Sequence, residues 1–455
     1  MEFAGADGGE CVIAIDLFAG GGGASLGIEL ALGRDVDLAI NHDAVALAAH
    51  RANHPRTRHL EASVWDVKPQ EAVEGRAVDV LWASPDCTHF SVAKGDVPRC
   101  SGKRSLAWAV HRWAKAVRPR VLFIENVREF QGWGPLGKDG RPDKRRAGKT
   151  FAAWVGALER LGYAVEWRVL DASAFGAPTR RRRLFIVARC DGQPIRWPAP
   201  THGPGLLPLR TAAECIDWSI PCPSIFERKR PLAAKTMWRI AESLRRFVLE
   251  SPSPYIVEMS HSNAPRDLAQ PLGTIIAGGS GCNGKHALVG AFLAKHFGGV
   301  VGHSLDERVA TVTARDHHSL AAASLVKLRG DCNGSDLRDP APTITARGTH
   351  IAEVRALLAA HCGPTPRART LFDAPRGMVM VRGVPHEIVD LGMRMLEPHE
   401  LLLAQFGEHA DGYDLSAAST KEAKVRLIGN SVAPHVAAAL VRANVGSSEL
   451  AEAAS

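Results

Sequence analysis

The amino-acid sequence predicts an α/β fold, in which a helix-covered sheet carries an inserted, smaller domain of mostly β and irregular structure. Between Cys11 and Arg189, short apolar runs alternate with amphipathic stretches, which is the pattern of a parallel sheet flanked by helices. After Arg189 the alternation ends, and proline-rich runs such as Trp197–Pro200 indicate a domain boundary. Helical patterning returns at Arg394. The expected parts are a first domain (1–190), an inserted domain (191–393) and a segment that returns to the first domain (394–455).

Each expected strand is a short apolar run, and each expected helix is an amphipathic stretch. The strands are Val12–Phe18, Val36–Ile40, Val78–Trp82, Val121–Ile124, Ala164–Leu170 and Leu184–Ala188. The helices are Ala24–Leu32, Ala44–Ala52, Ser105–Val117 and Phe151–Leu161, followed in the returning segment by Pro398–Phe406 and Val432–Val441.

Three similar segments recur in the inserted domain: Leu272–Ala277, Val309–Ala314 and Ala341–Ala346. Each is rich in β-branched residues and leads into a polar loop, as a strand would. Two interpretations fit this pattern. The segments are either a duplicated binding unit or three similar strands of one irregular β-rich domain.

The chain is basic, with 455 residues and a net charge of +8. Its cationic side chains cluster at Arg180–Arg183 and Lys144–Arg146 rather than in a terminal tail. This distribution favours a polyanionic partner, although a biased genome composition would also enrich arginine.

The nine cysteines show none of the paired spacings of a structural zinc site, so we expect reduced thiols and no metal. Residues Met1–Glu10 lack the basic and apolar regions of a signal peptide. No window approaches 18 uninterrupted apolar residues. These observations predict a cytoplasmic protein without a membrane segment.

A glycine-rich segment, Asp16–Gly27, joins the first expected strand to the first expected helix. Glycines allow a ligand to approach the backbone closely, and a helix N-terminus offers free N–H groups to an anionic group. Alone, this segment predicts a nucleotide-like ligand, which leaves NAD, FAD and S-adenosylmethionine as alternatives.

Two polar segments follow apolar strands at the edge where such a sheet forms its ligand crevice. Cys87 lies in Ala83–Ser91, and Glu125 lies in Phe123–Val127. The cysteine is placed either as a nucleophile or as a small buried residue. The glutamate is placed either as an acid or as a capping group.

Two further segments carry polar groups toward the same region. In Phe175–Val187, alternating side-chain directions would send Arg181 and Arg183 to one face, unless the arginines form a solvated edge. Leu427–Pro434 is expected to be a turn that opens the last helix.

The order of these five motifs resembles that of the DNA cytosine-5 methyltransferase family of bacteria and phages. The resemblance covers roughly residues 11–189 and 394–442, with a variable domain between them. It implies a Rossmann-like methyltransferase fold that uses S-adenosyl-L-methionine and acts on double-stranded DNA, with the inserted domain recognising the target sequence. It also implies a monomer. Two settings fit the resemblance: an enzyme that accompanies a restriction endonuclease, or a solitary phage or host-regulatory methylase.

For catalysis, the resemblance implies that Cys87 attacks carbon 6 of a flipped-out cytosine. Glu125 would hold the N3 edge and the amino group of the base, and Asn126 would brace the cysteine loop. Arg183, with Arg181 behind it, would reach the cytosine O2.

For the cofactor, the resemblance implies that Phe18 stacks near the adenine, that glycines line the methionine end and that Asn430 closes the pocket. The expected cofactor-binding residues are Asp16, Phe18, Ala19, Gly20, Gly22, Gly23, Asn41, His42, Asp66, Pro85, Asn430, Ser431 and Val432.

Two cofactor-binding positions depart from the family pattern. Asn41 stands where an acidic residue usually contacts the cofactor ribose, and Asp43 is an alternative for that role. The adenine-binding position is either Ser63 or Asp66.

Elementary chemistry accounts for the proposed catalytic set. Carbon 5 of cytosine is a poor nucleophile, and addition of a thiolate at carbon 6 turns the ring into an enamine that can accept a methyl group. The charge that develops at N3 and O2 requires an acid and a cation. Because a base inside a duplex is inaccessible, the cytosine must be flipped out.

Recognition of DNA is expected from loops and basic residues outside this set. The loops after the repeated segments carry Arg, Asn and Gly, which can reach base edges but are also common in ordinary turns: Ala277–Asn283, Arg315–Ser319 and Arg347–His350. The basic loop Lys138–Lys149 is expected to contact phosphates.

Two other functions were compared with DNA methylation. An RNA cytosine-5 methyltransferase of the same fold is disfavoured by the long inserted region. A catalytically silent DNA-binding protein is disfavoured by the presence of Cys87, Glu125 and Arg183.

Overall fold

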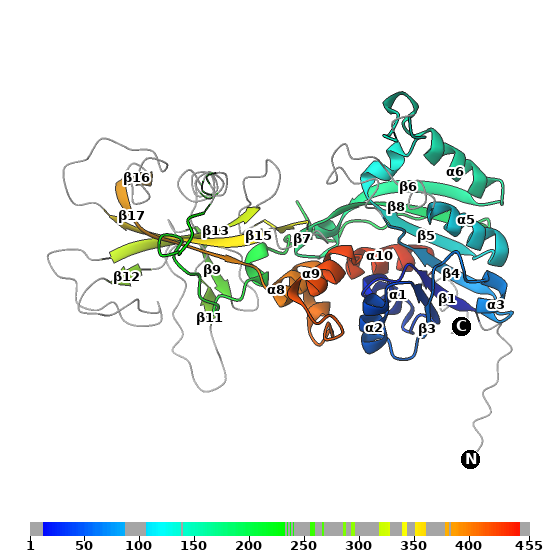
Figure 1. The fold of residues 1–455 in the computed structure, drawn as a ribbon, viewed down its shortest axis with the longest axis horizontal. Helices are drawn as coiled ribbons and strands as arrows, with labels where there is room; N and C mark the ends of the chain where they lie inside the picture. Colours follow the sequence, from blue (N-terminus) through cyan, green and yellow to red (C-terminus); the bar gives the residue numbers. More distant parts are fainter. Residues whose placement is uncertain are drawn as a thin grey trace, which may run out of the picture. The chain divides into compact units, whose positions relative to one another are not determined.

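The computed structural model describes residues 12–86, 106–137, 140–232 and 384–445, and between 233 and 381 it describes separate strands and short stretches (Figure 1). The chain divides into two compact units. The first consists of residues 1–210, 343–348 and 401–455, and the second of residues 211–342 and 349–400.

The first unit is built on a seven-stranded sheet with the order β3-β2-β1-β4-β5-β8-β6. Its strands are β1 (Ile13–Leu17), β2 (Leu38–Asn41), β3 (Arg58–Glu61), β4 (Val78–Ala83), β5 (Val121–Asn126), β6 (Ala164–Asp171) and β8 (Arg182–Arg189). The strands from β3 to β5 are parallel, whereas β8 is antiparallel to both β5 and β6.

The expectation of a wholly parallel sheet is therefore wrong at β8. Between β6 and β8 the chain has room only for the 3₁₀ turn η4 (Ala172–Phe175) and the short strand β7 (Thr179–Arg180). A parallel connection needs a crossover of a dozen residues or more, so the chain reverses direction instead.

The helices of the first unit are α1 (Gly23–Leu32), α2 (Ala44–Asn53), α3 (Pro69–Val73), α5 (Leu106–Val117), α6 (Lys149–Glu159), α9 (Lys421–Asn430) and α10 (Pro434–Asn444). Helix α8 (Pro398–Phe406) precedes the 3₁₀ turn η7 (Gly407–Ala410). The sequence analysis missed the short elements β3 and α3. It also read Leu427–Asn430 as a turn, whereas these residues end helix α9, which Thr420 caps by accepting a hydrogen bond from the Ala423 amide.

Two apolar cores form on the two faces of the sheet. One contains Trp113 of α5 and Trp154 of α6, both fully buried. The other contains Trp82 of β4 and Phe123 of β5, whose rings stack 5.6 Å apart, together with residues of α1 and α10. Figure 1 shows α10, near the end of the chain, beside α1, near its start.

Gly27 allows α1 and α10 to approach closely. A Cβ atom at this position would lie 2.5 Å from the Ala437 Cβ and 2.7 Å from the Pro434 carbonyl oxygen. Real Cβ atoms essentially never come this close to backbone, so a side chain here must push the helices apart.

We expect Gly27→Ala to destabilise the protein by about 1–3 kcal/mol, because the added methyl group overpacks this helix crossing. Gly156 provides a matched control, since it is also inside a helix but its Cβ would meet only flexible side-chain tips, the nearest 3.4 Å away. Gly156→Ala should stabilise by about 0.5–1 kcal/mol through helix propensity. Chemical denaturation of both variants measures the change in the free energy of unfolding, which should have opposite signs in the two. Equal changes would contradict the close contact proposed between α1 and α10 at Gly27.

The second unit is described mainly as strands. A five-stranded antiparallel sheet has the order β12-β13-β15-β17-β16, and a three-stranded sheet has the order β10-β9-β11. The first comprises β12 (Leu293–Lys295), β13 (His318–Lys327), β15 (Ile351–Ala360), β16 (Met378–Val381) and β17 (Val384–Met395), and the second comprises β9 (Tyr255–Met259), β10 (Arg266–Asp267) and β11 (Lys285–Ala287).

Most of the repeated segments lie outside the described residues. Leu272–Ala277 and Val309–Ala314 are not described, and only Ala341–Thr343 of the third copy is. The loops expected to reach base edges likewise fall almost entirely outside them, so these interpretations stay predictions.

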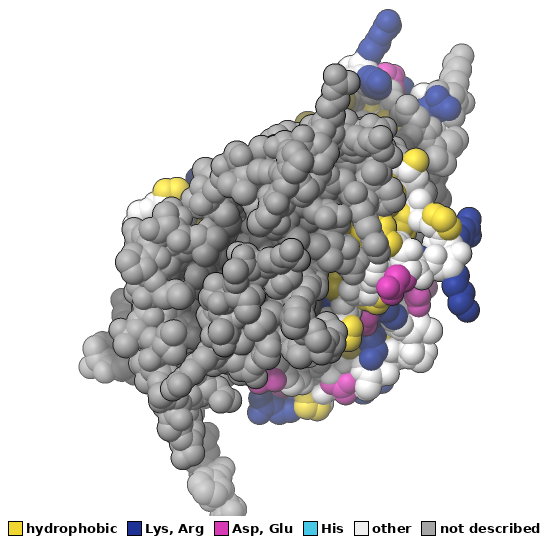
Figure 2. All heavy atoms as spheres, turned by 90° about the vertical axis from the view of Figure 1, so that its left-hand side faces the viewer, with side chains coloured by type: hydrophobic (Ala, Val, Ile, Leu, Met, Phe, Trp, Pro, Cys, Tyr) yellow, Lys and Arg dark blue, Asp and Glu magenta, His cyan; other side chains and the backbone are white. Residues whose placement is uncertain are grey.

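Two surface properties concern the described residues. On the face drawn in Figure 2, Lys and Arg side chains project in several separate groups, with Asp and Glu among them. Within the described parts of the chain, no helix is long and apolar enough to cross a membrane.

Candidate functional site

The first unit contains a cavity of about 670 Å³ at the edge of the sheet where the parallel strands end. Ligands of open α/β sheets bind at this edge. Residues at or just after the carboxyl ends of β1, β2, β3, β4 and β5 line the cavity. Because β8 is antiparallel, its first residues rather than its last reach the same edge, which places Arg183 in the cavity wall.

The glycine loop after β1 is held in an unusual conformation. Phe18 has a φ of 60°, which is uncommon for a residue with a side chain, and Gly22 has a φ of 97°. A Cβ atom at Gly22 would lie 2.3 Å from the Tyr413 Oη and 2.4 Å from the His54 Nε2. The Tyr413 hydroxyl donates a hydrogen bond to the Gly21 carbonyl, so a residue of the C-terminal segment holds this loop in place.

Asp16, at the end of β1, lines the cavity and is 1% exposed. Its Oδ2 accepts a hydrogen bond from Ser25 Oγ at 2.9 Å, whereas Oδ1 has no hydrogen-bond partner among the described residues. Burial raises the pKa of Asp16 to about 7. The carboxyl group is thus placed to respond to a charge bound in the cavity.

A chain of histidines connects Asp16 to the outer strand β3. Ser25 Oγ lies 2.9 Å from His50 Nε2, and His50 Nδ1 lies 2.9 Å from His59 Nε2. Burial holds the pKa of His50 well below its usual value and lowers that of His59 to about 4, so both rings are neutral at pH 7. One consistent set of tautomers has His59 donating to His50, His50 donating to Ser25 and Ser25 donating to Asp16.

Both alternatives for the ribose-binding position line the cavity, but they differ in their other contacts. Asn41 Nδ2 donates to the Ala19 carbonyl at 2.8 Å, and Asn41 Oδ1 accepts from the Asp43 amide. Asp43 caps helix α2 through the amides of Val45 and Ala46. Its second oxygen lies 3.2 Å from Arg426 Nη2. Both carboxylate oxygens of Asp43 therefore already have partners, the guanidinium of Arg426 and the first amides of helix α2.

After β3, Ser63 lines the cavity and Asp66 does not. Trp65 lines it too, with 38% of its surface exposed. The sequence analysis missed Trp65, although an aromatic residue between the two candidate polar positions was the available signal. An exposed indole in a cavity wall provides an apolar face for a flat ring.

The polar end of the cavity combines Glu125 with two arginines. Arg183 Nε lies 3.2 Å from Glu125 Oε1, and Glu125 is only 7% exposed. Arg181 is 4% exposed and donates from Nη1 to the Gly429 carbonyl at 3.0 Å. The contact with Gly429 ties the end of α9 to the segment that begins β8.

Asn126 follows Glu125 but faces the neighbouring loop. Its Nδ2 donates to the Pro85 carbonyl at 3.0 Å, and its Oδ1 accepts from the Val127 amide at 2.9 Å. Pro85 lines the cavity and lies two positions before Cys87, which itself is outside the described residues. Asn126 therefore holds the start of the segment that carries the cysteine.

Most of the predicted site residues meet in this one cavity: Asp16, Phe18, Gly20, Gly22, Gly23, Asn41, His42, Pro85, Glu125, Arg181, Arg183, Asn430, Ser431 and Val432. Three others do not line it: Ala19, Asp66 and Asn126. Ala19 is buried, and its carbonyl accepts a hydrogen bond from Asn41 Nδ2.

Comparisons with known proteins point to one family of enzymes. Residues 12–234 match the C-5 cytosine-specific DNA methylase family. The chain is 34% identical over 193 residues to the type II methyltransferase M.AgeI of Thalassovita gelatinovora, and 32% identical over 194 residues to the type II methyltransferase M1.HphI of Haemophilus parahaemolyticus. Each match covers 41% of this chain, and they cover 42% and 48% of the two relatives, which is less than half of their length.

A solved structure of an E. coli prophage-encoded DNA modification methyltransferase has the same fold. It aligns with a TM-score of 0.50 and 17% sequence identity, over 95% of this chain and 98% of that one.

Proposed function

Since the chain belongs, through residues 12–234, to the C-5 cytosine-specific DNA methylase family, we propose that it methylates carbon 5 of cytosine in double-stranded DNA within a specific sequence. S-adenosyl-L-methionine is the methyl donor that this family implies. The observation that carries the proposal is the meeting of Glu125, Arg181 and Arg183 with the glycine loop in one cavity. The relatives are type II methyltransferases, which supports a role in DNA modification.

The residues present fit the methyl donor. The cavity volume of about 670 Å³ lies within the range of about 300–1,000 Å³ that small-molecule sites occupy. Gly22 needs a conformation that other residues rarely adopt, and the N-terminus of α1 has no side-chain cap. Buried Asp16 has one carboxylate oxygen without a partner among the described residues, which suits a positively charged ligand.

We assign the donor's parts by the chemistry of the wall. Trp65 and Phe18 offer aromatic faces to the adenine ring, and Asn41 offers an amide to the ribose hydroxyls. Ser63 replaces Asp66 as the polar residue near the adenine, because only Ser63 lines the cavity. When bound, the donor supplies an electrophilic methyl group on a sulfonium.

On the substrate side, Cys87 adds as a thiolate to carbon 6 of a flipped-out cytosine, which makes carbon 5 nucleophilic. Glu125 meets the charge that develops at N3, and Arg183 meets the charge at O2. The contact between Arg183 and Glu125 orients both groups before the base arrives. Once carbon 5 carries the methyl group, loss of its proton to water releases the Cys87 thiolate and restores the aromatic ring.

Binding of the methyl donor should strengthen as the pH rises through 7. Asp16 is neutral below its pKa of about 7 and negative above it, and a cationic ligand in the same cavity favours the negative form. If binding fully ionises Asp16, linkage gives about a tenfold gain in affinity from about pH 6 to about pH 8, with release of a proton. Calorimetric titration at several pH values measures both quantities.

Asp16→Asn should flatten this pH dependence, because no group then ionises on binding. Asp35→Asn is the matched control, since Asp35 is paired with Arg56 and its pKa is already lowered by that contact. S-adenosylhomocysteine lacks the sulfonium charge and should show a weaker dependence. An unchanged pH profile in Asp16→Asn would refute the assignment.

The experiment that tests the function is bisulfite sequencing of DNA from a methylation-free bacterial host that expresses the protein. Protected cytosines in one short sequence context are the expected result. Unmodified DNA, with purified protein that binds the methyl donor, would instead favour RNA as the substrate, which transfer of labelled methyl groups to total RNA would reveal.

A further inference from the structure

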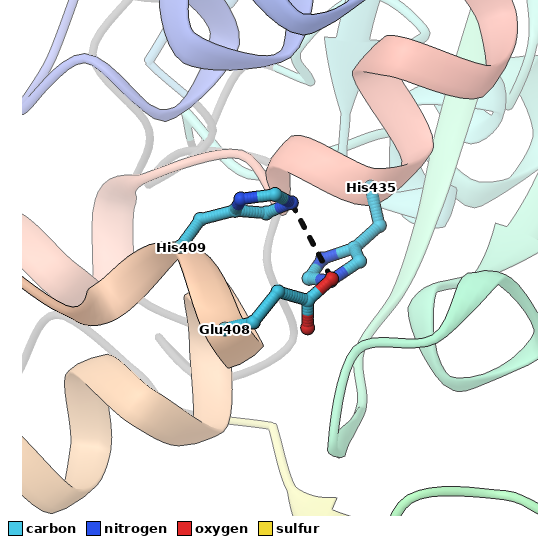
Figure 3. A group of neighbouring side chains, drawn as sticks. All are labelled: Glu408, His409 and His435. Atoms are coloured by element: carbon cyan, nitrogen blue, oxygen red, sulfur yellow. Dashed lines mark ion pairs between the residues drawn. The ribbon is translucent and has the colours of Figure 1, made fainter.

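Two histidines and a glutamate converge away from the cavity wall, in the same unit (Figure 3). Glu408 and His409 belong to η7, and His435 lies in the first turn of α10. Their potential ligand atoms all lie within 4.8 Å of one another. The proposed methylation uses none of the three side chains.

The spacing of these atoms suits a single metal ion. Glu408 Oε1 lies 3.3 Å from His435 Nε2 and 3.5 Å from His409 Nε2. Around a tetrahedral zinc ion with bonds of about 2.0–2.1 Å, neighbouring ligand atoms are separated by about 3.3–3.4 Å. Two of the three separations therefore already match, and the ligand atoms of the two rings, which lie within 4.8 Å of each other, would approach on binding.

The burial and hydrogen bonding of His435 also favour a bound ion, independently of the distances between the ligand atoms. Its side chain is 7% exposed, and neither ring nitrogen makes a hydrogen bond with a described residue. Its Nε2 faces Glu408 at ion-pair distance but without hydrogen-bond geometry. Buried ring nitrogens nearly always make a hydrogen bond or bind an ion, and Glu408 is the charged group that faces Nε2 here.

An arginine next to Glu408 orients its carboxylate toward the two histidines. Arg210 Nη1 forms an ion pair with Glu408 Oε2, which leaves Oε1 directed at both histidines. Outer partners of this kind orient ligating carboxylates in metal sites. Gly407, with a φ of 58°, permits the approach, because a Cβ atom there would lie 3.0 Å from the His435 ring and 2.9 Å from Arg210.

We propose that Glu408, His409 and His435 form a binding site for one divalent transition-metal ion of the zinc type. Two imidazoles and one carboxylate are donors that zinc, cobalt and nickel accept, whereas magnesium and calcium prefer oxygen alone. A fourth position remains for water. The ion ties η7 to the first turn of α10, and it is independent of the methylation chemistry.

The sequence did not mark this site and led to the expectation of no metal. Glu408 and His409 are adjacent, which is not a ligand spacing, and His435 follows only after α9. The cluster exists because α10 begins next to η7 in the folded unit.

The test is a calorimetric titration of the tag-free full chain with Zn²⁺ alone, after removal of bound metal with EDTA. Wild type should bind one equivalent more than His409→Ala and Glu408→Gln, with at least about a hundredfold loss of affinity at this site in each variant. His409 and Glu408 are not buried, so both variants should fold. The comparison with wild type also separates this site from zinc bound by cysteines.

His399→Ala is the matched control, because His399 is an exposed histidine that also faces a carboxylate, Asp217, at 3.7 Å. It should bind Zn²⁺ like wild type. Zn²⁺ should also raise the Tm of wild type and of this control but not that of the two site variants. Equal Zn²⁺ stoichiometry and affinity in all four proteins would overturn the proposal and leave an ordinary ion pair between Glu408 and His435.

Discussion

Replacing Cys87 by serine is expected to abolish DNA methylation. A serine hydroxyl is not ionised at neutral pH and cannot add to carbon 6 of cytosine as a thiolate does. Loss of a covalent nucleophile lowers kcat by about 10⁴-fold or more. Transfer of labelled methyl groups to DNA with purified protein measures this loss directly.

Cys190→Ser is the matched control for the same chemical change. Cys190 is half-buried, and its Sγ lies 3.4 Å from the Pro119 carbonyl, a contact that a serine hydroxyl retains. This variant should keep its activity. Wild type, but not Cys87→Ser, should also form a covalent complex with DNA that contains 5-fluorocytosine. Retained methylation in Cys87→Ser would exclude the covalent route.

Replacing Glu125 by glutamine is expected to reduce kcat by about 10²–10⁴-fold, which is the usual contribution of a general acid. Glutamine keeps the shape of the side chain but cannot supply a proton to N3 or carry the charge that pairs with Arg183. Glu125 lies in the same cavity as the glycine loop, but the substitution leaves that loop unchanged. The affinity for the methyl donor should therefore change little. Single-turnover kinetics and donor titration separate the two effects.

Glu129→Gln is the matched control for this substitution. Glu129 lies in the 3₁₀ turn η2 (Arg128–Gly132), and its carboxylate pairs with Arg128 at 3.2 Å instead of lining the cavity. This variant should retain activity. If Glu125→Gln were as active as Glu129→Gln, Glu125 would serve only to position Arg183.

Some of the site followed directly from local patterns. The glycine-rich turn after β1 and the polar residues after β4 and β5 are recognisable because each follows an apolar strand. Parallel strands end at one edge, so Asp16, Pro85 and Glu125 were expected together, and they line one cavity. The resemblance to DNA cytosine-5 methyltransferases is confirmed by the match of residues 12–234.

Other features depend on the direction of a strand or on contacts between distant segments. Arg183 reaches the cavity because β8 is antiparallel, which the length of the connection from β6 decides. α9 was missed because its residues are mostly polar and its stability comes from packing of buried Val425, Leu427 and Ile428.

The sequence by itself therefore determined the α/β class, most strands and helices of the first unit and a family resemblance, because periodicity and glycine turns are local properties of the chain. The tertiary structure alone decided which polar groups meet. It brought His50 between Ser25 and His59, placed Trp65 in the cavity wall and joined His435 to Glu408. Such contacts link segments that no local pattern relates, since they arise only when helices and strands pack together.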